Sequence, residues 1–128
     1  MRHFEDTNHH KRLRRILVNE IQQKGITDWR VLEALASVPR HFFMPQHLED
    51  RAYEDRPFPI GEEQTISQPY TVAYQTQLLD VHTTDRVLEI GTGSAYQASI
   101  LASIAYEVFS LVLKGKKSCS KETFTFHI

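Results

Sequence analysis

The residue types best suited to chemistry lie in a short stretch with two glycines, Glu89-Ile90-Gly91-Thr92-Gly93-Ser94-Ala95. Glycine lets the backbone turn sharply and approach a ligand closely, and amides at the start of a helix favour negatively charged or oxygen-rich groups. In doubly wound parallel sheets, nucleotide-like ligands bind at such a turn after the first strand. A bare G-x-G is also compatible with a tight turn that serves only packing, so the surrounding residues must decide.

The spacing around the glycines narrows the kind of ligand. The chain has no G-x-x-x-x-G-K-[ST] run, which excludes a P-loop phosphate site. A dinucleotide fingerprint needs a glycine three residues after Gly93, where Tyr96 stands. The acidic Glu89, two residues before Gly91, instead fits the pattern E/D-x-G-x-G-x-G of S-adenosylmethionine sites, with Ala95 in place of the third glycine.

The segments around this turn predict the start of a parallel sheet. A buried strand is expected over 87–90, a helix of small residues over 95–105 and a second strand over 106–113. Strand, glycine turn, helix and strand make one βαβ unit of about 30 residues. The 43 residues that follow Asp85 suffice for one such unit and a tail, whereas an average sheet has about five or six strands. We therefore expect an α/β fold class with an incomplete sheet.

The N-terminal part of the chain is predicted to be helical. Apolar residues recur at helical spacing at Leu13, Ile16, Leu17 and Ile21. The basic residues around the start of this helix, including Arg14, are typical of a solvated face. A second helix is expected to begin with Thr27 or Asp28 as its cap and to end before Pro39.

Between these helices and the glycine turn lies a long segment that predicts an ordered loop. Four prolines and Gly61 interrupt residues 40–69. Long loops without regular structure are uncommon in compact domains and are often functional. Two histidines in this segment, His41 and His47, have no third ligand at suitable spacing, so we expect no metal site. Tyr53 and Asp55 are candidates for either a turn or a site.

Composition limits the partners and the location of the protein. The 128 residues have a formal net charge of −1, which argues against nucleic acid or an anionic membrane as the main partner. The single cysteine, Cys119, forms no internal disulfide. The N-terminus has no apolar signal region, and no apolar stretch approaches the ~20 residues of a membrane span. We expect a cytoplasmic monomer.

Four blocks of the chain resemble protein-L-isoaspartate O-methyltransferases, in the order and at the spacing of that family. The blocks are Val38–Pro45, Ala52–Gly61, Gln64–Tyr70 and Val87–Gln97. The run Gln64-Thr65-Ile66-Ser67-Gln68-Pro69 is the most specific of them, and the resemblance covers about residues 10–110. It implies the N-terminal part of a Rossmann-like, S-adenosylmethionine-dependent methyltransferase fold.

The resemblance also implies a reaction and its residues. The methyl group of S-adenosylmethionine would pass to the free carboxylate of L-isoaspartyl residues in damaged proteins, and Ser67 would be the active-site residue. The cofactor-binding positions carried over from the family are Thr65, Ile66, Glu89, Gly91, Thr92, Gly93 and Ser94. Because a carboxyl group with a pKa of about 4 is already ionised at neutral pH, no strong base is needed. Without the resemblance, Ser67 would be interpreted as the cap of a helix that starts at Pro69.

Two departures from the family pattern bear on the site. Ala95 replaces the third glycine, and Val112 stands where the family has an acidic residue that receives the ribose hydroxyls. The expected organisation is a partial methyltransferase domain over 1–110, with a helical segment (1–50), an active-site loop (51–69) and a helix plus first βαβ unit (70–110), followed by a divergent, poorly structured tail over 111–128. For such a truncated chain we expect weak cofactor binding and no substantial activity. The alternatives are a non-catalytic remnant or interaction module, and a methyltransferase acting on another carboxylate.

Overall fold

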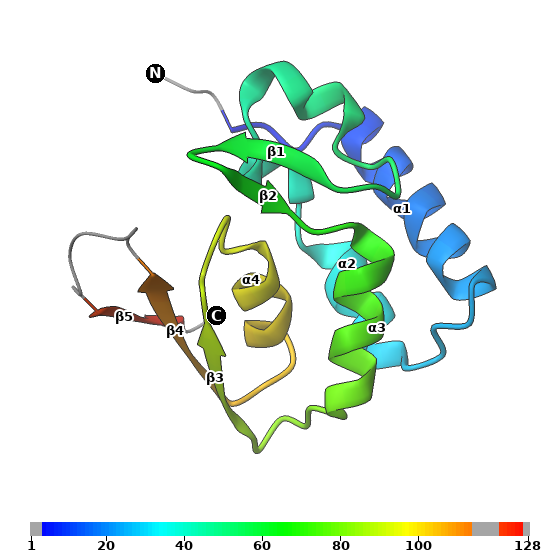
Figure 1. Ribbon diagram of the computed structural model, residues 1–128. Helices are drawn as coiled ribbons and strands as arrows, with labels where there is room; N and C mark the ends of the chain where they lie inside the picture. The colour runs from blue at the N-terminus through cyan, green and yellow to red at the C-terminus, as the bar shows by residue number, and fades with distance from the viewer. Residues whose placement is uncertain (1–3, 114–120, 127–128) are drawn as a thin grey trace.

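The computed structural model describes residues 4–113 and 121–126, which form an α/β arrangement (Figure 1). The helices are α1 (Asn8–Gln23), α2 (Trp29–Ser37), α3 (Pro69–Leu79) and α4 (Tyr96–Ala102), with the 3-10 helices η1 (Arg40–Phe43) and η2 (Gln46–Arg51). The strands are β1 (Phe58–Gly61), β2 (Gln64–Ile66), β3 (Arg86–Ile90), β4 (Glu107–Leu113) and β5 (Lys121–Phe126). The strands make an antiparallel hairpin, β1-β2, and a sheet of order β3-β4-β5.

Helix α1 begins at a capping box, in which Thr7 accepts a hydrogen bond from the His10 amide and the His10 ring accepts one in return. Its buried face differs from the predicted one. Arg14 is buried, whereas Ile16 is 55% exposed. The apolar spacing located the helix correctly. Its rotation about its own axis also depends on the hydrogen-bond partners of Arg14, which lie inside the fold.

Helix α2 lies in the middle of the helical layer and contacts α1, α3 and α4. Asp28, one of the two caps that the sequence left open, caps it by accepting a hydrogen bond from the Arg30 amide. The helix ends at Ser37 because Val38, which precedes a proline, adopts an extended conformation. Buried residues on its inner face, such as Leu35, join the main hydrophobic core.

The segment predicted as a loop over 40–69 contains both 3-10 helices and the β1-β2 hairpin. Phe58 and Ile66 are paired across the hairpin and both are buried, so their side chains fix its inner face. The turn at Gly61 has a positive φ of 98°. These strands are only four and three residues long and one contains a proline, which is why no periodic pattern predicted them.

Strands β3 and β4 are parallel and are joined through α4, as the predicted βαβ unit requires. Val108 and Ser110 on β4 are fully buried, and α4 contacts this strand. The prediction of a fully buried strand over 87–90 is wrong for Leu88 and Ile90, which are 59% and 66% exposed. A parallel strand is buried on both sides only when helices cover both faces of the sheet, and α4 covers one.

The end of the chain is described only in part. The strand predicted over 106–113 is present as β4, which extends to Leu113. Of the tail that was expected to be poorly structured, residues 114–120 and 127–128 lie outside the described residues, and β5 pairs with β4 in antiparallel register from Lys121 to Phe126. The alternation Thr123-Phe124-Thr125-Phe126 favours a strand, and pairing satisfies backbone groups along β4 that would otherwise lie at an open edge.

Within the described residues, none of the helices has the length and apolar character needed to cross a membrane.

Candidate functional site

A pocket of about 290 Å³ lies between two segments that are far apart in the sequence. One wall is the segment Thr65–Ser67, at the end of the hairpin, and the other is the turn between β3 and α4 (Figure 1). All eight residues that the sequence assigned to the site line this pocket: Thr65, Ile66, Ser67, Glu89, Gly91, Thr92, Gly93 and Ser94. Sequence reasoning missed five further lining residues, Val72, Gln75, Ile90, Tyr96 and Gln97.

An adjoining pocket of about 300 Å³ shares Thr65 and the glycine turn with the first and adds Gln64 and Val112. The site is therefore continuous along the turn towards the end of β4. A small-molecule site typically spans ~300–1,000 Å³, so the two neighbouring hollows are of a size that suits an extended ligand.

The glycine turn is held against β4 by its own backbone. The amides of Gly91 and Thr92 donate to the Leu111 carbonyl oxygen at 2.8 and 3.1 Å. Gly91 and Gly93 have positive φ angles of 89° and 54°, which favour glycine. A Cβ at Gly93 would meet no atom within 4 Å, so the space in front of this residue is open to a ligand.

Ala95 occupies the third glycine position with φ at 69°, in the left-handed region. A side chain disfavours this conformation by roughly 1–2 kcal/mol. The backbone of the turn thus keeps the shape that glycine would adopt, and the alanine places strain immediately before α4.

Glu89 is the one residue with a carboxylate among the described residues that line the first pocket. The Ser110 hydroxyl donates to it, and the Ser110 and Thr92 hydroxyl oxygens lie 2.6 Å apart. Burial raises the pKa of Glu89, while the hydrogen bond from Ser110 acts in the opposite direction. The carboxylate is therefore oriented from behind and faces the ligand space.

The Thr65–Ser67 segment is anchored by its middle residue. Ile66 is buried in the core, whereas Thr65 and Ser67 are exposed and line the pocket. The interpretation of Ser67 as a helix cap is not supported, because the N-cap of α3 is Gln68 and no side chain caps it. Among the described residues the Ser67 hydroxyl has no hydrogen-bond partner, so it is available to a ligand.

Asp55, left open between turn and site by the sequence, supports this segment from the side. Its Oδ1 accepts from the Tyr70 amide at 2.8 Å, in the first turn of α3, and its Oδ2 pairs with Lys24 at 2.5 Å. Its backbone carbonyl accepts from the Gln68 side chain at 3.2 Å. Asp55 therefore fixes the start of the helix that follows Ser67 and does not line the pocket.

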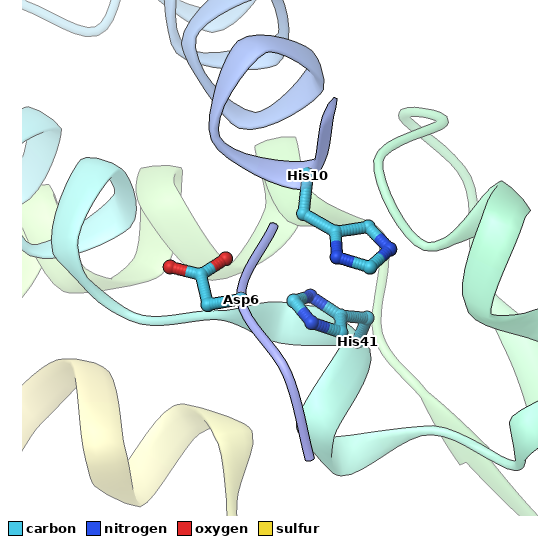
Figure 2. A group of neighbouring side chains, drawn as sticks. All are labelled: Asp6, His10 and His41. Atoms are coloured by element: carbon cyan, nitrogen blue, oxygen red, sulfur yellow. The ribbon is translucent and has the colours of Figure 1, made fainter. Parts of the chain in front are cut away.

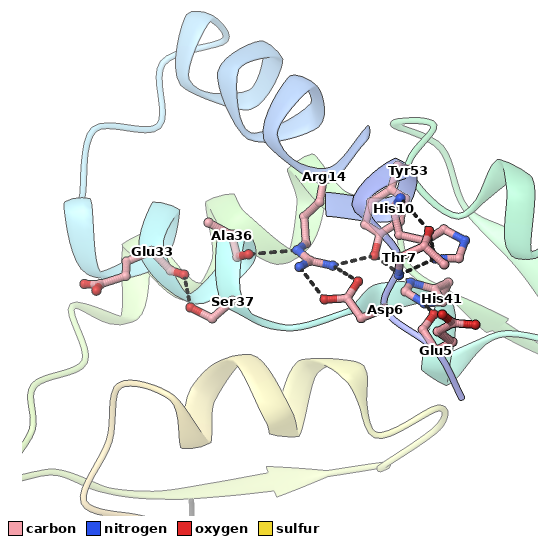
Figure 3. Close-up of polar contacts among 10 residues, drawn as sticks. All are labelled: Glu5, Asp6, Thr7, His10, Arg14, Glu33, Ala36, Ser37, His41 and Tyr53. Atoms are coloured by element: carbon pink, nitrogen blue, oxygen red, sulfur yellow. Dashed lines mark hydrogen bonds and ion pairs between the residues drawn. The ribbon is translucent and has the colours of Figure 1, made fainter. Parts of the chain in front are cut away.

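A second polar cluster lies away from the pocket, at the N-terminal segment. Asp6, His10 and His41 each bring one potential metal-ligand atom to within 4.8 Å of the other two (Figure 2). Both Asp6 oxygens, however, accept from Arg14 at 3.0 and 2.9 Å, and His41 Nδ1 lies 2.7 Å from the Tyr53 hydroxyl (Figure 3). These bonds engage the atoms that would bind a cation, so the cluster holds the N-terminal segment onto η1.

The comparison with known proteins agrees with the resemblance. The sequence pattern of the family described as protein-L-isoaspartate(D-aspartate) O-methyltransferase matches residues 11–116. The chain belongs to this family. A protein-L-isoaspartate O-methyltransferase from Flavobacterium psychrophilum is 54% identical over 108 residues, which cover 84% of this chain and 51% of that protein. One from Methanoculleus marisnigri is 59% identical over 92 residues, covering 72% and 42%. The chain thus spans about half the length of the curated relatives it matches.

Two solved structures of protein-L-isoaspartate O-methyltransferases have the same fold as this chain. One protein-L-isoaspartate O-methyltransferase superimposes with a TM-score of 0.69 at 27% identity, covering 79% of this chain and 34% of the other. A Plasmodium falciparum protein described by the same activity, solved in complex with S-adenosyl-L-homocysteine, gives a TM-score of 0.59 at 27% identity and covers 75% and 42%. The α/β, Rossmann-like character predicted from the sequence is therefore confirmed.

Proposed function

We propose that this chain contributes the cofactor turn and the acceptor-facing segment of a protein-L-isoaspartate O-methyltransferase site. The observation that supports the proposal is that Ser67 and the Gly91–Gly93 turn line the same pocket. The reaction would transfer a methyl group from S-adenosylmethionine to the carboxylate of L-isoaspartyl residues in damaged proteins. Within the 128-residue chain alone, we expect no substantial activity.

The residues of the hairpin and the glycine turn fit S-adenosylmethionine, whereas the residue at the end of β4 does not fit its ribose. Thr65, Ile66 and the turn Gly91–Ser94 would hold it, with open space in front of Gly93. The Glu89 carboxylate can accept hydrogen bonds there. The side chain of Val112, in the adjoining pocket, offers no acceptor to ribose hydroxyls. When bound, S-adenosylmethionine supplies an electrophilic methyl group on a sulfonium.

The protein's part in the reaction is alignment. An isoaspartyl carboxylate is ionised at neutral pH, so the site needs no group to remove a proton. The free hydroxyl of Ser67 would donate a hydrogen bond to one carboxylate oxygen and leave the other directed along the pocket. Alignment of reacting groups within a site can lower a barrier by about 7–11 kcal/mol. Ser67 is thus proposed as the catalytic residue.

Val112 also supports the second candidate, a non-catalytic remnant of the family. Loss of the ribose acceptor would weaken cofactor binding while leaving the helices and the pocket in place. A methyltransferase acting on another carboxylate is the third candidate, since the described part of the pocket does not by itself select isoaspartate. We further propose a cytoplasmic monomer without nucleic-acid or membrane partners, in keeping with the net charge of −1.

An NMR titration of the chain tests the proposal at the level of binding. With S-adenosylhomocysteine, we expect saturable amide shifts confined to 65–67 and 89–94, at about millimolar rather than micromolar concentration because Val112 lacks an acceptor. Gly93→Ala should weaken binding. Gly25→Ala is the matched control, since Gly25 also has a positive φ and open space at its Cβ but lies outside the pocket.

Peptides distinguish the candidates. A peptide containing L-isoaspartate should shift the Ser67 amide, and the same peptide with normal aspartate should not. Equal shifts with both peptides would favour another carboxylate, and scattered or absent shifts with both ligands would favour the remnant. Radiolabelled methyl transfer, measured alongside, should stay near background for the isolated chain.

A further inference from the structure

Arg40, in the 3-10 helix η1, is a fully buried cation next to the candidate site. Its Nε donates to the Ala52 carbonyl oxygen at 3.0 Å, and its Nη2 donates to the Ser67 carbonyl oxygen at 2.8 Å. The guanidinium lies over the Tyr96 ring, with its carbon 4.9 Å from the ring centre. One side chain therefore touches both walls of the pocket, because Ser67 and Tyr96 each line it.

The arrangement is costly for the folded protein. No carboxylate pairs with Arg40 among the described ion pairs, and its Nη1 has no hydrogen-bond partner among the described residues. Burying a guanidinium without a counter-ion is strongly unfavourable, and an unsatisfied buried donor adds to that cost. Burial also lowers the pKa of Arg40 and raises the pKa of Tyr96 to about 12, so the phenol stays neutral beneath the guanidinium.

We propose that Arg40 is a positioning residue that fixes the Ser67 segment at a set distance from the glycine turn. This inference rests on the proposed function, because Arg40 would affect the reaction through the position of Ser67. The two hydrogen bonds come from two different nitrogens, which a planar guanidinium holds in a fixed orientation while its flat face lies over the Tyr96 ring. Lysine supplies the charge and three donors on a single nitrogen, so it cannot reach both carbonyl groups in this orientation and keep the same ring contact.

Arg14 provides a matched control for Arg40. It is also a buried arginine, its Nε donates to a backbone carbonyl, that of Ala36, at 2.7 Å, and its guanidinium lies near a tyrosine ring, Tyr53 (Figure 3). Its hydrogen-bond partners are Asp6, Ala36 and Tyr53, and none of them lines the pocket. A general effect of losing a buried arginine should appear in both positions, whereas a positioning effect should appear only at Arg40.

Hydrogen–deuterium exchange of the 128-residue chain tests this, with Arg40→Lys, Arg40→Met and Arg14→Lys compared with the unsubstituted protein. We expect exchange in peptides covering 62–68 and 93–99 to rise by about tenfold in Arg40→Met and by less in Arg40→Lys. In Arg14→Lys the peptide 62–68 should stay within about twofold, while α1 becomes less protected. If Arg40→Met fails to fold, the comparison of Arg40→Lys with Arg14→Lys decides.

Affinity for the isoaspartyl peptide, followed at the Ser67 amide, provides the functional measurement. Arg40→Lys should weaken it by about tenfold and Arg14→Lys should not. Unchanged protection of 62–68 in the Arg40 variants, or equal loss in Arg14→Lys, overturns the proposal. If the unsubstituted chain binds no peptide, the proposed function fails, and the exchange data still decide whether Arg40 fixes the segment.

Discussion

Ser110 on β4 donates a hydrogen bond from its hydroxyl to a carboxylate oxygen of Glu89 on the neighbouring strand β3. Register pairs the two residues directly, Glu89 opposite Ser110, so the bond follows from parallel pairing of the strands. The Ser110 hydroxyl is fully buried and also lies 2.6 Å from the Thr92 hydroxyl. The strand pair thus orients the acidic residue and the glycine turn as one unit.

Removing this hydroxyl should destabilise the fold. In Ser110→Ala, Glu89 and Thr92 lose a buried partner, so we expect the free energy of unfolding to fall by about 1–3 kcal/mol. Urea denaturation measures the change. Ser103→Ala is the control, because Ser103 is exposed and its hydroxyl donates to the Ser99 carbonyl oxygen one turn earlier in the chain. Equal losses in the two variants would contradict a special role for the buried bond.

Replacing Ala95 by glycine should stabilise the protein. Its φ of 69° costs alanine more than glycine, and we expect a net gain of about 1 kcal/mol in the free energy of unfolding after the greater entropy of unfolded glycine is included. Ala98→Gly, three residues later and inside α4, should have the opposite sign, because glycine in a helix interior costs about 1 kcal/mol. A loss of stability in Ala95→Gly would show that the methyl group packs favourably.

Stability should decline as the pH falls below neutrality because of His41. Burial lowers the pKa of His41 below its usual value of about 6.5, and the neighbouring His10 adds to this, while Glu49 and Asp6 oppose it. The unfolded chain therefore binds the proton more readily, so the stability contributed by neutral His41 is complete above pH ~6.5 and is lost as the pH falls towards the lower, folded value. Denaturation midpoints from pH 7.5 to 5 should show the slope.

The pH slope should become shallower in His41→Gln and stay unchanged in His47→Gln. His47 is exposed and serves as the control. The N-terminal segment should be the first to respond, because His10 and His41 are stacked with ring centres 3.9 Å apart beneath it. A slope that survives His41→Gln would assign the effect to another group.

Val112→Glu should bind S-adenosylhomocysteine, the product of the cofactor, more tightly. The residue lines the hollow next to the glycine turn, and a carboxylate there can accept two hydroxyl hydrogen bonds. We expect the affinity for S-adenosylhomocysteine, measured by isothermal titration, to rise by about tenfold. Val112→Gln has the same length as the glutamate without its charge and should gain less. No gain in either variant would place the ribose elsewhere.

The sequence by itself determined the local features of this protein. The glycine turn, the Asp28 cap, the βαβ unit and the family blocks are all encoded within short windows, where spacing and residue type restrict the backbone directly. Two assignments based on such windows were nevertheless incomplete. Leu88 and Ile90 were expected inside, and Arg14 was expected outside, because a periodic pattern does not show which face another segment covers.

Only the tertiary structure decided which distant segments meet. The approach of Ser67 to the Gly91–Gly93 turn depends on α3 and α4, which both pack against α2 and are joined by the hydrogen bond from the Gln97 side chain to the Thr76 hydroxyl at 3.0 Å. The burial of Arg40 depends on carbonyl groups from two other segments that no local pattern specifies. Contacts between distant segments arise from the packing of a whole core, and each one depends on many residues that are individually ordinary.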